Sequence, residues 1–181
     1  MNTPLIDAGR EAMLRALQDG GVSYVLIGGA ALETHRQPHR TDDVDITPAI
    51  DPLNLERLAD VLNALECRLV TDVDDESSWV ALPTGYFTGA TLRRADVWNL
   101  HTRHGALDVT FRPSGFPRGF EDLQENAEQL QIAGTSIVVP VASLHDVEHS
   151  KRTADRPKDR DYLSRVGRLR PSQTHPEPAS E

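Results

Sequence analysis

The 181-residue sequence contains a single cysteine, Cys67, and so has no pair of cysteines to join. One cysteine excludes the disulfide scaffolds of small secreted proteins, and the ordinary role of such a residue is to fill a core. The longest apolar runs fall short of the roughly 18 residues of a membrane-spanning helix, and no basic segment followed by an apolar one opens the chain. We therefore expect a cytoplasmic protein without membrane association.

Positive charge is scarce over most of the chain, whose formal net charge is −9. Residues 1–150 carry 11 Lys and Arg against 23 Asp and Glu, whereas residues 151–170 carry eight basic and three acidic side chains. The basic segment predicts either a surface for a triphosphate and an RNA backbone, or a solvated helix face or contact for an acidic partner. Its basic residues are Lys151, Arg152, Arg156, Lys158, Arg160, Arg165, Arg168 and Arg170.

Apolar periodicity and turn residues predict a single α/β domain over residues 1–170, with a mixed sheet flanked by helices. Its catalytic core would span about residues 22–140 and its C-terminal helices about 142–170, and the Pro- and Ser-rich residues 171–181 predict a disordered tail. Helices are expected at 5–17, 51–64, 120–130, 143–151 and 157–169. Strands are expected at 23–27, 43–46, 95–100 and 105–111, with two short strands around a turn within 131–139.

The predicted strand at 23–27 ends in a glycine pair, Gly28 and Gly29. Glycine has no Cβ and lets backbone amides approach a ligand closely. Good helix formers follow at residues 30–33, so the start of a helix would point at the same spot. The segment therefore predicts an anion site.

Two carboxylates follow on the next strand, in Asp43-Val44-Asp45-Ile46. Alternation with the period of a strand places both Asp side chains on one face and sends Val44 and Ile46 into the core. Neighbouring carboxylates repel each other unless a cation lies between them, and Mg²⁺ takes carboxylate oxygens together with substrate phosphates.

A third carboxylate, Asp108, lies in Gly105-Ala106-Leu107-Asp108-Val109-Thr110-Phe111. Its apolar neighbours occupy the opposite strand face, and residues 95–100 would pair with this strand as a hairpin. Two-metal phosphoryl chemistry needs such a ligand beside the attacking hydroxyl, so Asp108 is the candidate.

In this order, the Gly28-Gly29 pair, the Asp43 and Asp45 pair and the strand Asp108 resemble the nucleotidyltransferase superfamily typified by DNA polymerase β. The later segment with Lys151 and Arg156-Pro157-Lys158-Asp159 is similar to the minimal nucleotidyltransferases grouped with the AbiEii and MenT toxins. Several of those toxins have Ser where Gly29 stands, so a backbone amide and not a hydroxyl would contact phosphate here. The resemblance covers roughly residues 22–163 and implies a nucleotidyltransferase fold.

The resemblance also implies roles for individual residues. Asp43, Asp45 and Asp108 would hold two Mg²⁺ ions, or Mn²⁺, and Lys151 and Asp159 would complete the catalytic set. The nucleotide would be bound by Gly28, Gly29, Arg40, Thr41 and Lys151. The reaction implied is transfer of a nucleoside monophosphate from an NTP to an acceptor hydroxyl.

Three alternatives for the biological role remain open. The toxin resemblance implies transfer to the 3′ end of tRNA and a cognate antitoxin protein, with the oligomeric state undetermined. A small-molecule enzyme of the aminoglycoside-resistance kind shares the fold, and an acidic body suits a cationic substrate. A catalytically idle NTP-binding module is the third. Zinc binding by His145 and His149, spaced by four residues, is disfavoured because no Glu follows the first His.

Overall fold

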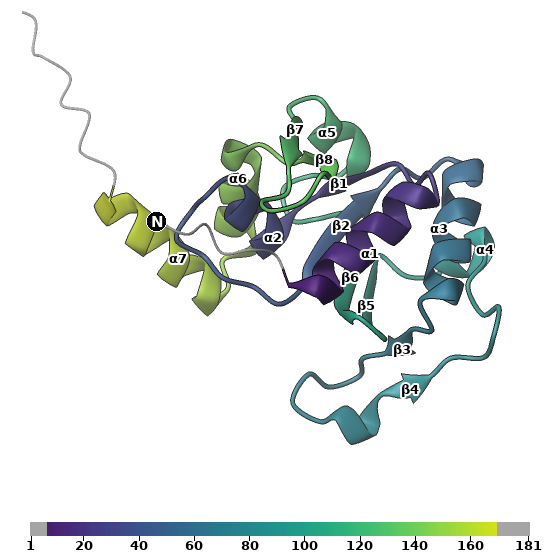
Figure 1. Cartoon of the computed structure of the whole chain (residues 1–181). Helices are drawn as coiled ribbons and strands as arrows, with labels where there is room; N and C mark the ends of the chain where they lie inside the picture. Colours follow the sequence, from purple (N-terminus) through teal and green to yellow (C-terminus); the bar gives the residue numbers. More distant parts are fainter. Residues whose placement is uncertain (1–6, 170–181) are drawn as a thin grey trace, which may run out of the picture.

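A mixed eight-stranded sheet lies at the centre of the computed structural model, which describes residues 7–169 (Figure 1). Its strand order is β4-β3-β5-β6-β2-β1-β8-β7. Neighbouring strands are parallel at β1–β8 and β2–β6 and antiparallel elsewhere. The strands are β1 (Tyr24–Leu26), β2 (Val44–Pro48), β3 (Arg68–Leu69), β4 (Val80–Ala81), β5 (Val97–Thr102), β6 (Gly105–Thr110), β7 (Glu128–Gln131) and β8 (Val138–Val141).

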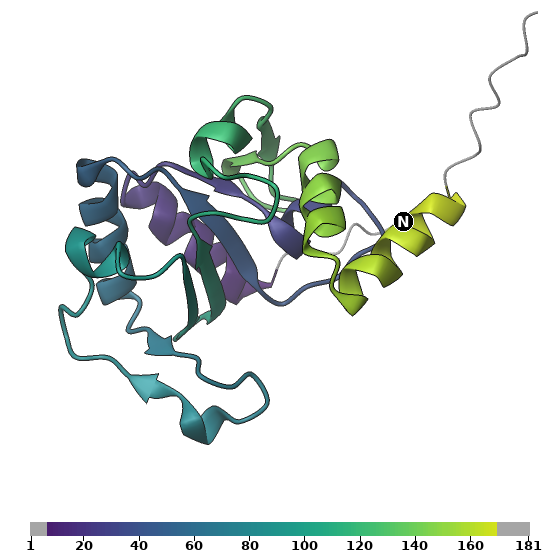
Figure 2. The same ribbon diagram turned by 180° about the vertical axis from the view of Figure 1, so that it is seen from behind.

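Helices cover both faces of this sheet. Helix α1 crosses in front of the strands in Figure 1, and α6 lies in front in the opposite view of Figure 2. Within residues 7–169 we find no helix with the length and apolar character needed to cross a membrane. The helices are α1 (Ala8–Asp19), α2 (Gly28–Thr34), α3 (Pro52–Ala64), α4 (Gly89–Leu92), α5 (Phe120–Gln124), α6 (Leu144–Ala154) and α7 (Pro157–Leu169), with a 3-10 turn, η1, at Glu76–Ser78.

The central strands alternate between core and polar side chains as predicted. Val44, Ile46, Leu107 and Val109 are all buried, while Asp45 and Asp108 are only partly covered. Because β1 runs antiparallel to β2 and pairs Leu26 with Ile46, the carboxyl end of β1 meets the start of β2. The sheet therefore brings the glycine pair to the carboxylates.

Helix-start signals in the sequence are confirmed. Asp51 caps α3 by accepting from the Asn54 amide, with Pro52 in the first turn, and Ser143 caps α6 by accepting from the Asp146 amide. Helix α1 begins at Ala8 and not at residue 5, and residues 5 and 6 lie outside the described chain, as does the predicted tail at 171–181.

The helix predicted at 120–130 is wrong beyond its first turn and a half. Helix α5 ends at Gln124, and Glu128–Gln131 forms the edge strand β7, in which Leu130 pairs with Val139. The two strands expected within 131–139 are also misplaced, since β8 runs on to Val141. Pairing with β8 decides the conformation of this polar segment, and local propensity does not.

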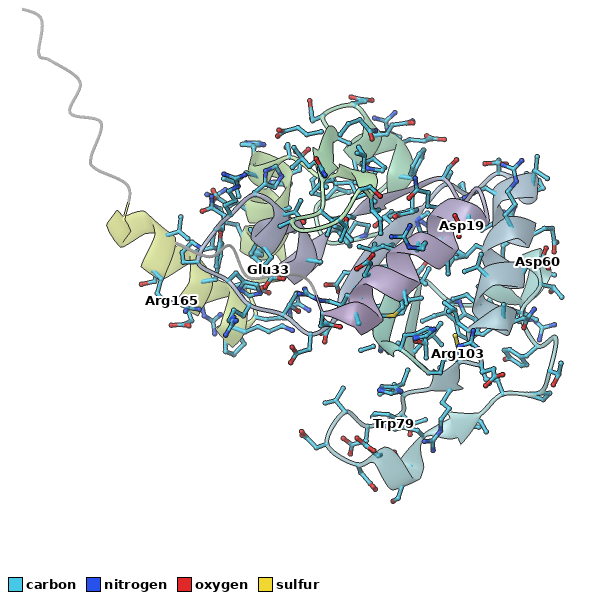
Figure 3. All side chains as sticks on the ribbon, viewed as in Figure 1. Asp19, Glu33, Asp60, Trp79, Arg103 and Arg165 are labelled. Atoms are coloured by element: carbon cyan, nitrogen blue, oxygen red, sulfur yellow. The ribbon has the colours of Figure 1, made fainter. Side chains whose placement is uncertain are left out.

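The segment between β3 and β4 projects from the body at the lower edge of Figure 1. It carries the acidic run at residues 72–76, which is exposed as expected for solvated surface. Trp79, labelled in Figure 3, holds this segment against the sheet. Its Nε1 donates to the Asp72 carbonyl at 2.7 Å, and its ring packs on that of His101, with ring centroids 4.7 Å apart. Further along the chain, Phe87 in the loop at residues 84–89 is buried against Trp98, so its ring is not exposed to a ligand.

Candidate active site

The glycine pair is required by the position of a carboxylate. Gly28 has a φ of +61°, and a Cβ added there would lie 2.3 Å from Oδ2 of Asp45. At Gly29 an added Cβ would lie 2.8 Å from both Thr41 Cβ and His39 Nε2. The Ile27 amide donates to the Asp45 carbonyl at 2.9 Å, which fixes the glycine turn beside the start of β2. A side chain at either glycine would displace the loop that carries Asp45 or the loop before it.

Asp45 and Asp108 are direct neighbours on the parallel strands β2 and β6, where their Cα atoms are register partners. Burial and the charge of Asp43 raise the pKa of Asp45 to about 6. Burial and the charges of Asp45 and Asp43 raise the pKa of Asp108 to about 7. The three carboxylates thus repel one another strongly enough that a nearby cation would stabilise their ionised forms.

The donor set fits a hard divalent cation, because it consists of carboxylate oxygens that share one negative field. Asp43 precedes β2, and its amide donates to Thr41 Oγ1 at 3.4 Å. In the described part of the chain, no three His, Cys, Asp or Glu side chains are already close enough together to hold a metal ion. Asp45 and Asp108 form the pair, and assignment of Asp43 as the third ligand stays a prediction.

Lys151 is held at the corner between α6 and α7 by Asp159. Lys151 Nζ lies 2.9 Å from Asp159 Oδ1, and Arg156 Nε lies 2.7 Å from Asp159 Oδ2. Burial of Asp159 opposes ionisation, but the hydrogen bonds from Lys151 and Arg156 outweigh it and lower the pKa of Asp159 below its usual value. Asp159 therefore acts on the site through Lys151, whose ammonium also lies 5.4 Å from the Tyr162 ring centre.

One cleft of about 360 Å³ joins these groups. Its walls include Gly28, Asp45, Asp108 and Lys151, so the structure brings together four of the predicted site residues. The other five predicted residues, Gly29, Arg40, Thr41, Asp43 and Asp159, do not line it. Arg40 is exposed, and Thr41 lies behind Gly29.

Two polar residues of the cleft, Asn99 and Asp146, were absent from the sequence prediction. Asn99 pairs with Asp108 across the β5–β6 hairpin, so the hairpin register was a signal that could have found it. Asp146 follows the helix cap Ser143 by three residues, where an acidic residue is ordinarily part of a helix start. The sequence pattern therefore hides it.

Comparison with known proteins identifies the fold. No family model and no curated protein matches the sequence. Solved structures do match in three dimensions, and two of them are described here. A Thermotoga maritima protein described as a nucleotidyltransferase (TM1012) gives a TM-score of 0.51 at 13% identity, covering 89% of this chain and 91% of its own. The antibiotic-resistance factor ANT(2'')-Ia gives 0.52 at 15% identity, covering 90% and 83%. The chain has the nucleotidyltransferase fold.

Within this nucleotidyltransferase fold, the basic helices are largely neutralised by their own acidic residues. Ion pairs join Arg152 to Glu148, Arg160 to Asp155 and Arg165 to Asp161 at 3.0–3.1 Å. Lys158 makes no ion pair with the residues described here, and its charge lowers the pKa values of both Asp45 and Asp108. The structure leaves the side chain of Arg168 and all of Arg170 undescribed.

His145 and His149, the pair spaced for zinc, lie in different surroundings. His149 packs its ring against Phe116, with centroids 5.4 Å apart, while His145 is exposed beside Asp146. Neither histidine lines the cleft.

Proposed function

We propose that the chain is a metal-dependent nucleotidyltransferase. An oxygen–phosphorus bond forms between the acceptor hydroxyl and the α-phosphorus of an NTP, the bond from that phosphorus to the α,β-bridging oxygen breaks, and pyrophosphate leaves. The observation that carries the proposal is the in-register pair Asp45 and Asp108, which lines the same cleft as Lys151. The fold shared with the two solved structures supports it.

The predicted nucleotide-binding residues have the following roles in this reaction. The amides of Gly28 and Gly29 approach the β- and γ-phosphates, because a glycine has no side chain to cover its backbone. Lys151 neutralises the triphosphate, and Asp159 positions Lys151. Arg40, exposed in the loop before β2, meets phosphate from outside, and Thr41 supports the glycine turn.

Asp43, Asp45 and Asp108 would hold two Mg²⁺ ions, or Mn²⁺ in their place. Bound divalent ions would neutralise the triphosphate and lower the pKa of the attacking hydroxyl. Asp108 lies between Asp45 and Asn99 in strand register and takes up the proton that the acceptor hydroxyl loses.

For the acceptor we propose the 3′ end of tRNA, with the chain as the toxin of a toxin–antitoxin pair. The support is the resemblance of Lys151 and the Arg156-to-Asp159 segment to the AbiEii and MenT group, together with the basic residues of α6 and α7. Transfer of a nucleotide to the tRNA end would block aminoacylation and hence translation.

A small cationic molecule is the second candidate acceptor. The net charge of −9 and the paired carboxylates of the cleft favour a positively charged ligand. The similar fold of the antibiotic-resistance factor ANT(2'')-Ia adds to this candidate.

The test is incubation of the pure protein with Mg²⁺, each α-labelled NTP and total tRNA, with RNA resolved from protein on a gel. Asp45→Ala is the inactive control, and Asp161→Asn, an exposed carboxylate of α7 paired only with Arg165, is the matched active control. Label on tRNA that is lost in Asp45→Ala supports the toxin-like enzyme.

The other outcomes distinguish the alternatives. Label transferred to a cationic small molecule and not to tRNA supports the second candidate. NTP binding without transfer to any acceptor contradicts an enzyme and leaves the idle binding module.

A further inference from the structure

Asp146 is a buried carboxylate of the cleft that the proposed chemistry leaves unused. Its side chain is only 6% exposed, yet it lines the same cleft as Asp45, Asp108 and Lys151. Within residues 7–169, Oδ2 has no hydrogen-bond partner, and Oδ1 has only the exposed His145 ring at 3.5 Å. Leaving a buried polar atom unpaired costs about 1–3 kcal/mol, so its position calls for a ligand.

Helix capping does not account for this side chain. Ser143 Oγ accepts from the Asp146 amide at 3.1 Å, which caps α6 through the backbone of Asp146 and not its carboxylate. The return bond of a capping box, from the Ser143 amide to the acidic side chain, is absent in the described chain. Asp146 instead borders the cleft through the small part of its side chain that stays exposed.

Asp146 shares the cleft with several apolar side chains. Phe116, Leu123, Ala142 and Val147 are buried residues that also line it. Apolar walls with one well-placed polar group are typical of sites that bind a small molecule in one orientation.

We propose that Asp146 reads the nucleobase of the NTP by accepting a hydrogen bond from an amino group on its edge, and so selects against uracil. This inference rests on the proposed function, because it places the base of the same NTP whose phosphates meet Lys151. Asp146 and Lys151 lie on one helix, and five residues of α-helix rise about 7.5 Å, a span suited to a nucleoside.

The hydrogen-bonding groups of the bases decide which NTPs Asp146 can bind. A carboxylate only accepts, so it pairs with the amino groups of cytosine, adenine and guanine. Uracil offers a single N–H between two carbonyl oxygens, and these would face the carboxylate with like partial charge. UTP is therefore the NTP that Asp146 rejects.

The experiment measures equilibrium binding of four NTP analogues with a methylene α,β-bridge, in Mg²⁺, by isothermal titration calorimetry. Wild type is compared with Asp146→Asn, which keeps the side-chain shape but offers one donor and one acceptor. Among the NTPs that carry an amino group, we take the one that wild type binds most tightly. In Asp146→Asn we expect its dissociation constant to rise about tenfold, while the dissociation constant of UTP changes by no more than about twofold or falls. Asp161→Asn is the matched control and should leave all four unchanged.

Base dependence separates recognition from structural damage. An equal change for all four NTPs, or none, overturns the inference while leaving the proposed function intact. A changed KM for a cationic acceptor with unchanged NTP binding overturns it in favour of an acceptor site. Failure of the wild type to bind any NTP overturns both, and circular dichroism melts of each variant verify folding.

Discussion

At the scale of single residues, Gly28 is a position where an added side chain would be tolerated poorly. Gly28→Ala would bring a Cβ to 2.3 Å from Asp45 Oδ2 at a φ of +61°, so Asp45 or the turn must move. We expect nucleotidyl transfer to fall about 100-fold or more, since displacement of a reacting group by about 1 Å costs that much. The measurement is the rate of label transfer. Gly167→Ala, where an added Cβ meets nothing within 4 Å, is the matched control and should retain full activity.

Asp45 should destabilise the protein whenever no cation is present. Its pKa is raised from 3.8 to about 6, which means that the folded state favours the protonated form. The contribution of Asp45 to the free energy of unfolding is therefore fully present below about pH 4 and is lost as pH rises through 6. In EDTA at pH 8 we expect Asp45→Asn to unfold at higher urea, with a gain on the order of 1–3 kcal/mol. The gain should be smaller at pH 5. A variant less stable than wild type at pH 8 would contradict the argument.

At the scale of elements, the corner between α6 and α7 depends on Asp159. Its side chain is fully buried between Lys151 and Arg156, so Asp159→Asn leaves both cations without a charged partner. We expect a loss of about 2–4 kcal/mol in urea unfolding at pH 7. Asp161→Asn breaks only an exposed pair and should cost under about 1 kcal/mol.

The pH dependence gives this prediction its sign. The pKa of Asp159 is lowered, so its contribution is present above about pH 4 and lost as pH falls through the lowered value. The difference between wild type and Asp159→Asn should therefore shrink on acidification. A difference that is constant with pH would mean that packing, and not charge, holds the corner.

Elements with strong local signals were predictable from the sequence. Helices α3 and α6 follow from a cap residue and apolar spacing, and β5 and β6 from alternation around Arg103 and His104. The β7 segment was not predictable, because Glu128–Gln131 is polar and becomes a strand only by pairing with β8. Strands β3 and β4 have two residues each, too few for any periodic signal.

The candidate site divides in the same way. Asp45 and Asp108 could be found because the alternation of apolar and polar residues along their strands indicates which face each residue occupies. Asp146 could not, because the cleft that it lines is formed by residues far apart in the sequence, from Ile27 to Arg156. The relation of Asp159 to Lys151 likewise needed the turn at Asp155, which adopts a left-handed φ of 47°.

At the scale of the whole molecule, the C-terminal third completes the sheet. Strand β8 pairs with β1 and stands between it and the edge strand β7, and the Ala142 amide donates to the Leu26 carbonyl at 2.9 Å. We expect calorimetry to show one unfolding transition with equal calorimetric and van't Hoff enthalpies. Two resolved transitions would show that the C-terminal helices unfold separately from the core.

The two tryptophans lie in very different surroundings. Trp98 is 7% exposed and donates to the Leu92 carbonyl, between two residues, Val97 and Asn99, that line the cleft. Trp79 is partly exposed on the projecting segment. The chain therefore carries two intrinsic fluorophores in different surroundings. A Trp79→Phe variant would leave an optical signal from Trp98 alone, on the sheet face opposite the cleft, to follow unfolding of the core without any attached dye.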